Sequence, residues 1–512
     1  MKFKKSIFLS LASMVAWAAF GQQTADLHLS ISVSNELKAK VRSEGRLFVF
    51  LSEDVEGEPR TQLWPMGVKK NHIFAKNLKW DPAKPLEADA GTGMMTTAPF
   101  NLGQVPSGTY RLQVLWDQDT QESGLNAPGN VFSEPRNVEI TKGQKLEIRL
   151  TEVIPPRQLV DDPLVKLVDF TSDTLSKWWK KPVKVKASVL LPAGFYDHPG
   201  AKYPVRYNVA GYGGRYTRVN YLVERDPDFF RWWTSDEAPR IINVFLDGEG
   251  PFGDSYQLDS DNSGPYGYAL THELIPYIEK QYRGIGTPQS RFVDGCSTGG
   301  WVSLALQLYY PDFFNGTWSY SPDAIDFENY QLIDIYKDDN AFYNEWGNQH
   351  PVARDLTGDP IVNMKDFIRY ENVQGSSDTY LNSGGQFSAH AALYSPKGEN
   401  GLPKPLFDPQ TGKIDHQVAE YWKKYDLKLY LKENWAELGP KLQGKIWIWM
   451  GDMDHFYLNP ATRAFDEFLK TTENPKSDAY IHFDAMQGHC QQYSHMEVLK
   501  MMGAKVKAQA KQ

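Results

Sequence analysis

Six residues near the middle of the chain, Gly295-Cys296-Ser297-Thr298-Gly299-Gly300, place a serine in the pattern G-x-S-x-G. A short apolar run precedes them, and Trp301 to Tyr309 has the apolar spacing of a helix. A serine at such a strand-to-helix turn is held in a strained, exposed position, and side chains in place of the flanking glycines would collide with the adjacent strand and helix. The helix N-terminus would stabilise negative charge developing nearby. The pattern therefore predicts that Ser297 is a nucleophile.

A serine hydroxyl needs a histidine to take its proton and a carboxylate to orient that histidine. His489, in Gln487-Gly488-His489-Cys490, follows the last predicted strand, and Gly451-Asp452-Met453-Asp454-His455 follows the predicted strand before it. We expect Asp454, which lies 35 residues before His489, to orient it, with Asp452 as the alternative. No further His or Cys spacing completes a metal site around this Asp-x-Asp-His string, so no metal is expected.

The chain has two cysteines, and each adjoins one of the proposed catalytic residues. Cys296 precedes Ser297 and Cys490 follows His489, so a disulfide between them would bring the serine and the histidine to the same place. Such a bridge closes a loop of about 195 residues, for which chain entropy gives roughly 5 kcal/mol. Two free buried thiols are the alternative.

A glycine-rich segment, Ala210-Gly211-Tyr212-Gly213-Gly214, follows the predicted strand Val205 to Val209. Backbone amides at such a position can hold the oxyanion of an acyl-transfer intermediate, and we expect the N–H groups of Tyr212 and Thr298 to do so. The alternative is a glycine turn that only reverses the chain.

A second polar segment, Asp259-Ser260-Asp261-Asn262-Ser263-Gly264, begins like a calcium loop. Position 12 of that loop would be Leu270, where a bidentate Glu is required, so calcium binding is excluded. The segment is either a polar wall of the substrate cleft or a plain loop.

The elements around these residues alternate between strands and helices from about residue 160 onward. The predicted strands are 183–190, 205–209, 241–246, 445–450 and 480–483, and the predicted helices are 270–282, 301–309 and 461–469. This alternation indicates an α/β fold with a mainly parallel sheet, over residues 160–505. Residues 323–444 interrupt it as a lid rich in Asn, Asp, Gly and aromatics, with helical pieces such as 419–435. Its aromatic residues suit either an aromatic or sugar substrate or the core; examples are Trp346, Phe387 and Tyr394.

The first part of the chain has a different pattern. Residues 26–152 consist of short alternating segments separated by turn clusters, and the segments are 27–33, 46–51, 73–80, 110–116 and 146–150. This is typical of an all-β sandwich of the immunoglobulin-like kind. It could act as a spacer or bind carbohydrate, because a sandwich fold alone implies no function.

The N-terminus and the overall charge indicate where the protein works. Residues 1–21 have lysines, an apolar run and a small-residue cleavage site, which predicts a cleavable signal peptide and a periplasmic or secreted protein; an uncleaved anchor is the alternative. The mature chain has no apolar stretch of membrane-spanning length. The formal charge of -8 over 512 residues, without a basic block, excludes nucleic acid as a partner.

Several segments resemble a known family of enzymes. They are Tyr203-Pro204-Val205, Glu273-Leu274-Ile275-Pro276, Arg291 to Gly300, and Pro311-Asp312-Phe313-Phe314. The chain is similar here, and again over 445–492, to the putative esterase family, which includes esterase D, feruloyl and acetyl xylan esterases, and mycolyltransferases. The resemblance implies an α/β-hydrolase fold with Ser297, Asp454 and His489 as catalytic residues. Ala210-Gly211 stands where the family has His-Gly. The cysteine placement resembles the disulfide-linked Cys-Ser and His-Cys neighbours of tannases and fungal feruloyl esterases.

The sequence thus predicts an exported serine esterase that forms an acyl-Ser297 intermediate and needs no cofactor. By resemblance, its substrates are small-molecule or polysaccharide esters of the phenolic, feruloyl or acetyl type. The alternatives are a serine peptidase of the prolyl oligopeptidase type, an acyltransferase, and a non-catalytic carbohydrate-binding surface protein.

Overall fold

The computed structural model describes residues 24–510. The predicted signal peptide, residues 1–21, lies outside this range. Within the described range, none of the helices combines the length and the apolar character that crossing a membrane would require.

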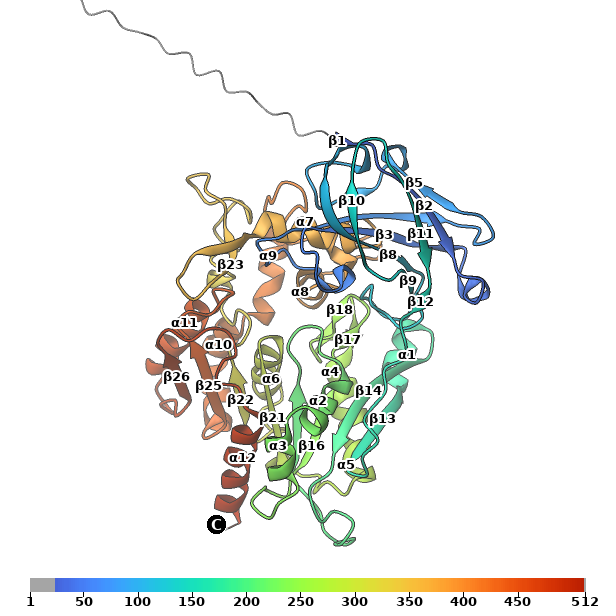
Figure 1. Ribbon diagram of the computed structural model, residues 1–512. Helices are drawn as coiled ribbons and strands as arrows, with labels where there is room; N and C mark the ends of the chain where they lie inside the picture. The colour runs from blue at the N-terminus through green and yellow to red at the C-terminus, as the bar shows by residue number, and fades with distance from the viewer. Residues whose placement is uncertain (1–23, 511–512) are drawn as a thin grey trace, which may run out of the picture.

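The first 130 described residues form a β sandwich (Figure 1). A larger sheet has the order β12-β9-β8-β3-β4-β6 with β10 beside β8, and a smaller sheet has the order β11-β2-β5. Apolar residues from both sheets share one core, among them Ile31, Val49 and Val114. The predicted strands of this region are confirmed, and the observed strands are β1 (Thr24–Ala25), β2 (His28–Val33), β3 (Glu44–Ser52), β4 (Asn71–Lys79), β5 (Leu86–Ala88), β6 (Met95–Thr96), β7 (Val105–Pro106), β8 (Gly108–Asp117), β9 (Val131–Phe132), β10 (Arg136–Ile140), β11 (Lys145–Leu150) and β12 (Glu152–Val153).

An eight-stranded sheet organises the rest of the chain, in the order β13-β14-β16-β15-β21-β22-β25-β26. Strands β16 to β26 along this order run parallel, while β13 and β14 are antiparallel to their neighbours. This order and direction are those of the α/β-hydrolase sheet. The strands are β13 (Val165–Ser172), β14 (Val183–Leu190), β15 (Val205–Val209), β16 (Ile242–Leu246), β21 (Arg291–Cys296), β22 (Thr317–Tyr320), β25 (Ile446–Gly451) and β26 (Tyr480–Asp484).

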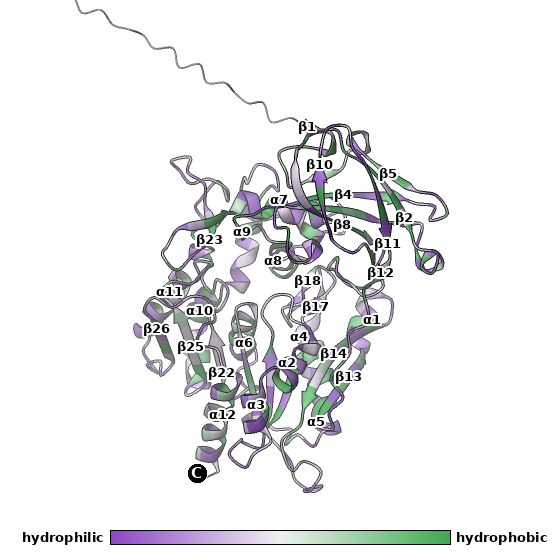
Figure 2. Cartoon of the chain, viewed as in Figure 1, coloured by the Kyte–Doolittle hydropathy of each residue, from purple (hydrophilic) through white to green (hydrophobic). Residues whose placement is uncertain are grey.

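The central strands have side chains buried on both faces, because helices cover both sides of the sheet. Their apolar residues are visible as hydrophobic stretches in Figure 2. The helices are α1 (Asp173–Trp179), α2 (Val219–Glu224), α3 (Pro227–Trp233), α4 (Tyr266–Ala269), α5 (Ile275–Gln281), α6 (Thr298–Tyr309), α7 (Met364–Gln374), α8 (Gln386–Tyr394), α9 (His416–Trp422), α10 (Leu427–Leu442), α11 (Asn459–Lys470) and α12 (His495–Gln509), and short β ribbons are β17–β18 (Glu249–Gly250, Gly253–Asp254), β19–β20 (Asp259–Ser260, Gly264–Pro265) and β23–β24 (Pro351–Arg354, Pro360–Asn363).

Two predicted helices differ from the observed ones. The predicted helix 419–435 is two helices, α9 and α10, because Asp426 leaves the helical path and its side chain accepts the N–H of Leu429 as an N-cap. The predicted helix 270–282 begins earlier, with α4, and contains a π-helical turn at Leu270–Leu274. The elements without a counterpart among those predicted from the sequence include β13, β22, α1, α2, α3, α7, α8 and α12.

Helices α7 and α8 lie between the sandwich and α6 (Figure 1). On α7, Tyr370 and Val373 pack on the face of the larger sheet that does not look into the sandwich core, against residues such as Phe50. The Tyr370 hydroxyl donates to the backbone oxygen of Asn71, at 2.9 Å. The sandwich therefore contacts the segment predicted to be a lid.

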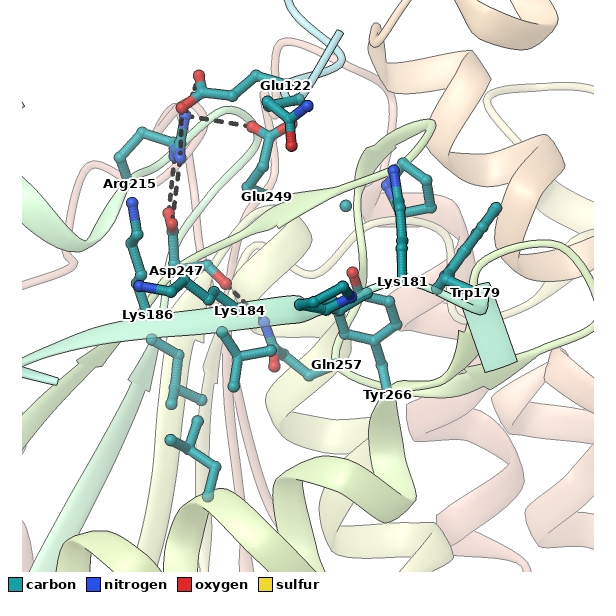
Figure 3. A pocket seen from close by; sticks show the side chains of 18 residues that line it. Glu122, Trp179, Lys181, Lys184, Lys186, Arg215, Asp247, Glu249, Gln257 and Tyr266 are labelled. Carbon is teal, nitrogen blue, oxygen red and sulfur yellow. Dashed lines mark hydrogen bonds and ion pairs between the residues drawn. The ribbon is translucent and has the colours of Figure 1, made fainter. Parts of the chain in front are cut away.

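A second junction is ionic. Arg215, which follows the glycine-rich segment, contacts Glu122 of the sandwich at 2.7 Å, Asp247 at 2.7 Å and Glu249 at 3.2 Å (Figure 3). Arg157, in the connection between the two regions, also contacts Glu122, at 2.6 Å. Burial raises the pKa of Glu122, but the two guanidinium groups outweigh it and hold that pKa below its ordinary value. These ion pairs join the sandwich to the sheet.

Candidate active site

Ser297 occupies the sharp turn between β21 and α6. Its backbone has φ 61° and ψ -129°, a conformation that residues with side chains rarely adopt. A Cβ at Gly295 would lie 2.5 Å from the backbone of Gly299, and a Cβ at Gly299 would collide with the oxygen of Val209. The structure confirms the steric reason for both glycines. The turn holds Ser297 at the carboxyl end of the sheet.

The glycine-rich segment passes directly beside this turn. Gly214 N donates to Gly211 O at 3.0 Å, which closes a tight turn around Tyr212. A Cβ at Gly211 would lie 3.6 Å from Cβ of Ser297. Among the interactions within residues 24–510, the amides of Tyr212 and Thr298 donate to no other group. Both predicted oxyanion donors therefore lie near Ser297 with their N–H groups unused.

The two cysteines form the predicted disulfide, with Cα atoms 6.0 Å apart and a sequence separation of 194. The alternative of two free thiols is therefore wrong. The N–H of Cys490 also donates to Oγ of Ser321, just after β22, at 3.1 Å. These two bonds fix the loop after β26, which carries His489, against the Ser297 turn.

Asp454 and not Asp452 contacts the histidine. Oδ2 of Asp454 lies 2.7 Å from Nδ1 of His489, and the Asp454 side chain is fully buried. Its other oxygen, Oδ1, accepts the N–H of Phe456 at 2.9 Å. Asp452 instead forms an ion pair with Arg463 on α11, at the surface.

The charge on Asp454 changes the proton affinity of His489. Burial by itself lowers the pKa of His489, but the charge and hydrogen bond of Asp454 outweigh it, and Asp323 adds to their effect. The pKa of His489 is therefore raised above its ordinary value. Phe456 packs edge-on against the imidazole, with ring centroids 4.9 Å apart.

His455 and Tyr493, for which the sequence predicted no role, hold the His489 loop in place. His455 Nδ1 accepts the N–H of His489 at 3.0 Å, so this nitrogen carries no proton. Tyr493 donates its hydroxyl to Oδ2 of Asp294, at 2.8 Å, and Asp294 is paired with Arg206 inside the sheet, where neither side chain is exposed. This chain of contacts ties the His489 loop to β15 and β21.

A narrow cavity of about 40 Å³ opens beside Ser297. Its walls are mostly aromatic, and its polar groups are few; it is lined by Trp64, Tyr212, Ser297, Asp323, Ala324, Tyr330, Gln331, Val352, Phe367, Gln386, Phe387, His390, Phe456 and Leu458. The lining residues come from the sandwich, the glycine-rich segment, the Ser297 turn, the segment after β22, β23, α7, α8 and the loop after β25. A larger cavity of about 370 Å³ lies at the Arg215 junction and is not lined by Ser297 (Figure 3).

Trp64, between β3 and β4 of the sandwich, lines the cavity and was not predicted from the sequence. Its ring stacks on Tyr212 with centroids 5.4 Å apart and meets Phe367 edge-on at 5.3 Å. No local pattern distinguishes Trp64 from other turn residues, because its role depends on how the sandwich docks.

The three aromatic residues singled out in the predicted lid have different positions. Phe387 lines the cavity. Tyr394 is 1% exposed in the core, and Trp346 is 76% exposed. The polar segment 259–264 does not line the cavity: Asn262 donates to the backbone oxygens of Ala392 and Ser395 at the end of α8, so the segment supports that helix.

The chain was compared with known proteins at the level of sequence, structure and family. None of the curated proteins matches the chain. Among solved structures, a ferulic acid esterase has 17% identity and a TM-score of 0.42, over 67% of this chain and 97% of that one. An S-formylglutathione hydrolase from Agrobacterium tumefaciens has 14% identity and a TM-score of 0.37, over 68% of this chain and 94% of that one. A CE1 ferulic acid esterase from Anaeromyces mucronatus has 13% identity and a TM-score of 0.32, over 69% of this chain and 91% of that one.

The family comparison covers more than half of the chain. The model of the family described as Putative esterase matches residues 181–499, a range that contains Ser297, Asp454 and His489. The chain therefore belongs to the putative esterase family, and it is a serine hydrolase of carboxylic esters with the α/β-hydrolase fold.

Proposed function

We propose that this protein is an exported esterase in which Ser297, His489 and Asp454 carry out the reaction. The observation that carries the proposal is the 2.7 Å contact between His489 and the buried Asp454, in a loop that a disulfide fixes to the Ser297 turn. Export is proposed from the signal sequence, and a disulfide is the bond expected in an oxidising compartment.

The proposed reaction has two steps. His489 takes the proton of Ser297 as Oγ attacks the ester carbonyl, and it returns that proton to the alcohol oxygen as the ester bond breaks. Water then attacks the acyl-Ser297 in the same way, and the acid leaves. Asp454 keeps the imidazole oriented and stabilises its charged form, while the N–H groups of Tyr212 and Thr298 hold the oxyanion. None of these steps uses a cofactor.

The proposed substrates are polysaccharide-linked or phenolic esters, of which the size of the cavity favours those with a short acyl group. The cavity volume of about 40 Å³ is far below the roughly 300 Å³ or more of a typical small-molecule pocket, so a compact group fits it better than a bulky one. An acetyl group therefore suits this space better than a feruloyl group. A sugar alcohol would remain outside the cavity.

The proposal is tested by mass spectrometry of the intact mature protein after treatment with a fluorophosphonate probe. We expect one adduct on Ser297, none in Ser297→Ala, and a mass increase of two hydrogen atoms on reduction of the disulfide. Folded protein that takes no adduct would contradict the proposed nucleophile.

Matched substrates separate the remaining alternatives. Hydrolysis of an aryl acetate without cleavage of the corresponding anilide indicates an esterase and not a peptidase. Product analysis with added alcohol distinguishes hydrolysis from acyl transfer.

A further inference from the structure

Asp323 is a buried carboxylate in the cavity beside Ser297, and the reaction proposed above does not use it. It lies just after β22, its side chain is 9% exposed, and its N–H lies 3.4 Å from the backbone oxygen of Ser297. One of its oxygens, Oδ2, accepts three hydrogen bonds: from the Tyr256 hydroxyl at 2.8 Å, from Oγ1 of Thr298 at 3.0 Å and from Nε2 of Gln386 at 3.1 Å. These bonds fix the orientation of the carboxylate.

The other oxygen, Oδ1, accepts no hydrogen bond from any residue between 24 and 510. Burial raises the pKa of Asp323, but His390 and the hydroxyls of Tyr256 and Thr298 outweigh it, so the pKa lies below its ordinary value and the group is ionised. No Lys or Arg lines the cavity, and the basic side chain nearest to Asp323 in its lining is His390, whose Nε2 lies 3.6 Å from Oδ2. The cavity therefore presents an unused negative acceptor to whatever enters.

Gln386 supplies a second acceptor on the same wall. Its Nε2 is engaged with Asp323 and with the Tyr256 hydroxyl, at 2.6 Å, whereas its Oε1 has only a long contact of 3.4 Å with Oγ1 of Thr298. Gln386 starts α8, and the buried Glu371 of α7 accepts the N–H groups of Phe387 and Ser388 at that end. The acceptor pair is thus held by rigid elements.

We propose that Asp323 binds a hydroxyl or ammonium group on the acyl part of the ester, so that the enzyme selects short hydroxyacyl or aminoacyl esters over plain acyl esters. This rests on the proposed function, because the acyl group must be attached to Ser297 next to the cavity. A compact cavity suits the acyl end of the substrate, since a polysaccharide alcohol extends beyond it. Both donors share one chemistry, a hydrogen bond to an ionised carboxylate.

Asp326 provides a matched control three residues along the chain. It is also a fully buried carboxylate, but it is paired with Lys428 at 2.9 Å and accepts from Asn329 at 2.7 Å, and it does not line the cavity. Its loss disturbs the same region of the fold without changing the acceptors beside Ser297.

The test compares phenyl esters of three nearly isosteric acids: propionic acid, glycolic acid and glycine. The preference is the ratio of kcat/KM for the glycolyl or glycyl ester to that for the propionyl ester, divided by the ratio of their hydroxide-catalysed rates. In the wild-type protein we expect a corrected preference of tenfold or more, which Asp323→Asn lowers by about tenfold to a hundredfold. Asp326→Asn should leave it unchanged. The ester with the larger preference identifies the donor as ammonium or hydroxyl.

A corrected preference near one in the wild-type protein, or an equal preference in Asp323→Asn, overturns the proposal. If Asp323→Asn does not fold, the corrected preference of the wild-type protein tests the proposal by itself. Hydrolysis of the propionyl ester reports the proposed esterase function separately, because that ester offers no donor. A purely structural role of Asp323 would change all three rates together and leave the preference unaltered.

Discussion

The floor and the cover of the active-site cavity are held together by different forces. The floor, formed by the Ser297 turn and the His489 loop, is fixed by a disulfide, by the His489–Asp454 contact and by the buried Arg206–Asp294 pair. The cover, formed by Trp64, α7 and α8, contacts the groups around the floor through aromatic rings, such as the Trp64–Tyr212 stack, and through the uncharged amide of Gln386. Covalent and charged contacts have strict geometry, whereas each ring pair contributes only about 0.5–1.5 kcal/mol beyond burial. The difference indicates that the floor sets the chemistry and the cover sets the selectivity.

The sharpest test of the floor is the pair Asp454→Asn and Asp452→Asn. Loss of the orienting carboxylate lowers kcat by about 10⁴-fold in a serine triad, and we expect a decrease of that order for Asp454→Asn. Asp452 pairs with Arg463 at the surface, so its variant should retain activity within a few fold. Steady-state kinetics on an aryl acetate measures both. A large loss in Asp452→Asn would show that the wrong carboxylate has been assigned.

The disulfide should affect both stability and alignment. Replacing Cys296 and Cys490 by serine opens a loop of 194 residues, and the expected loss is about 2–5 kcal/mol in the free energy of unfolding. Denaturant unfolding measures it, and the fluorophosphonate labelling rate of the folded variant reports how far Ser297 and His489 have moved. Unchanged stability and labelling would mean that the bridge is dispensable for the floor.

Removal of Trp64 tests the cover. Trp64→Ala removes ring contacts with Tyr212, Phe367 and Phe456, and we expect kcat/KM to fall about tenfold through loss of these pairs. The sandwich core does not include Trp64, so the unfolding of the sandwich should be little changed. Trp64→Phe should restore part of the activity. If Trp64→Ala is fully active, the sandwich is only a spacer.

The smallest expected effect is a shift in the pH dependence of kcat/KM, which depends on His489 in the floor and on Asp323 in the cavity. Catalysis requires neutral His489, so kcat/KM falls as the pH drops through its pKa, and the raised pKa places this acidic limb above the ordinary value of 6.5. Asp323 contributes to the rise, so Asp323→Asn should move the limb to lower pH, while Asp326→Asn should not. A limb below 6.5 in the wild-type protein contradicts the ion-pair geometry. Because the protonated form is favoured in the fold, the stability from this pair is complete below pH 6.5 and is lost as the pH rises through the raised pKa.

The sequence alone predicted the floor because its signals are local. The glycines around Ser297 are required by contacts within a few residues of the turn, and the strands are recognisable as apolar runs. The two cysteines added long-range information, since each lies beside a proposed catalytic residue and their pairing implies that Ser297 and His489 meet.

The tertiary structure alone decided which carboxylate reaches His489, that Trp64 covers the site, and that Asp323 faces the cavity. Asp452 and Asp454 are alternatives in sequence, and the choice depends on the direction in which the loop after β25 leaves the sheet. Trp64 precedes Ser297 by more than two hundred residues, and Asp323 lies at the border of the predicted lid. Their positions result from docking of separate regions through many weak contacts, which no short stretch of sequence encodes.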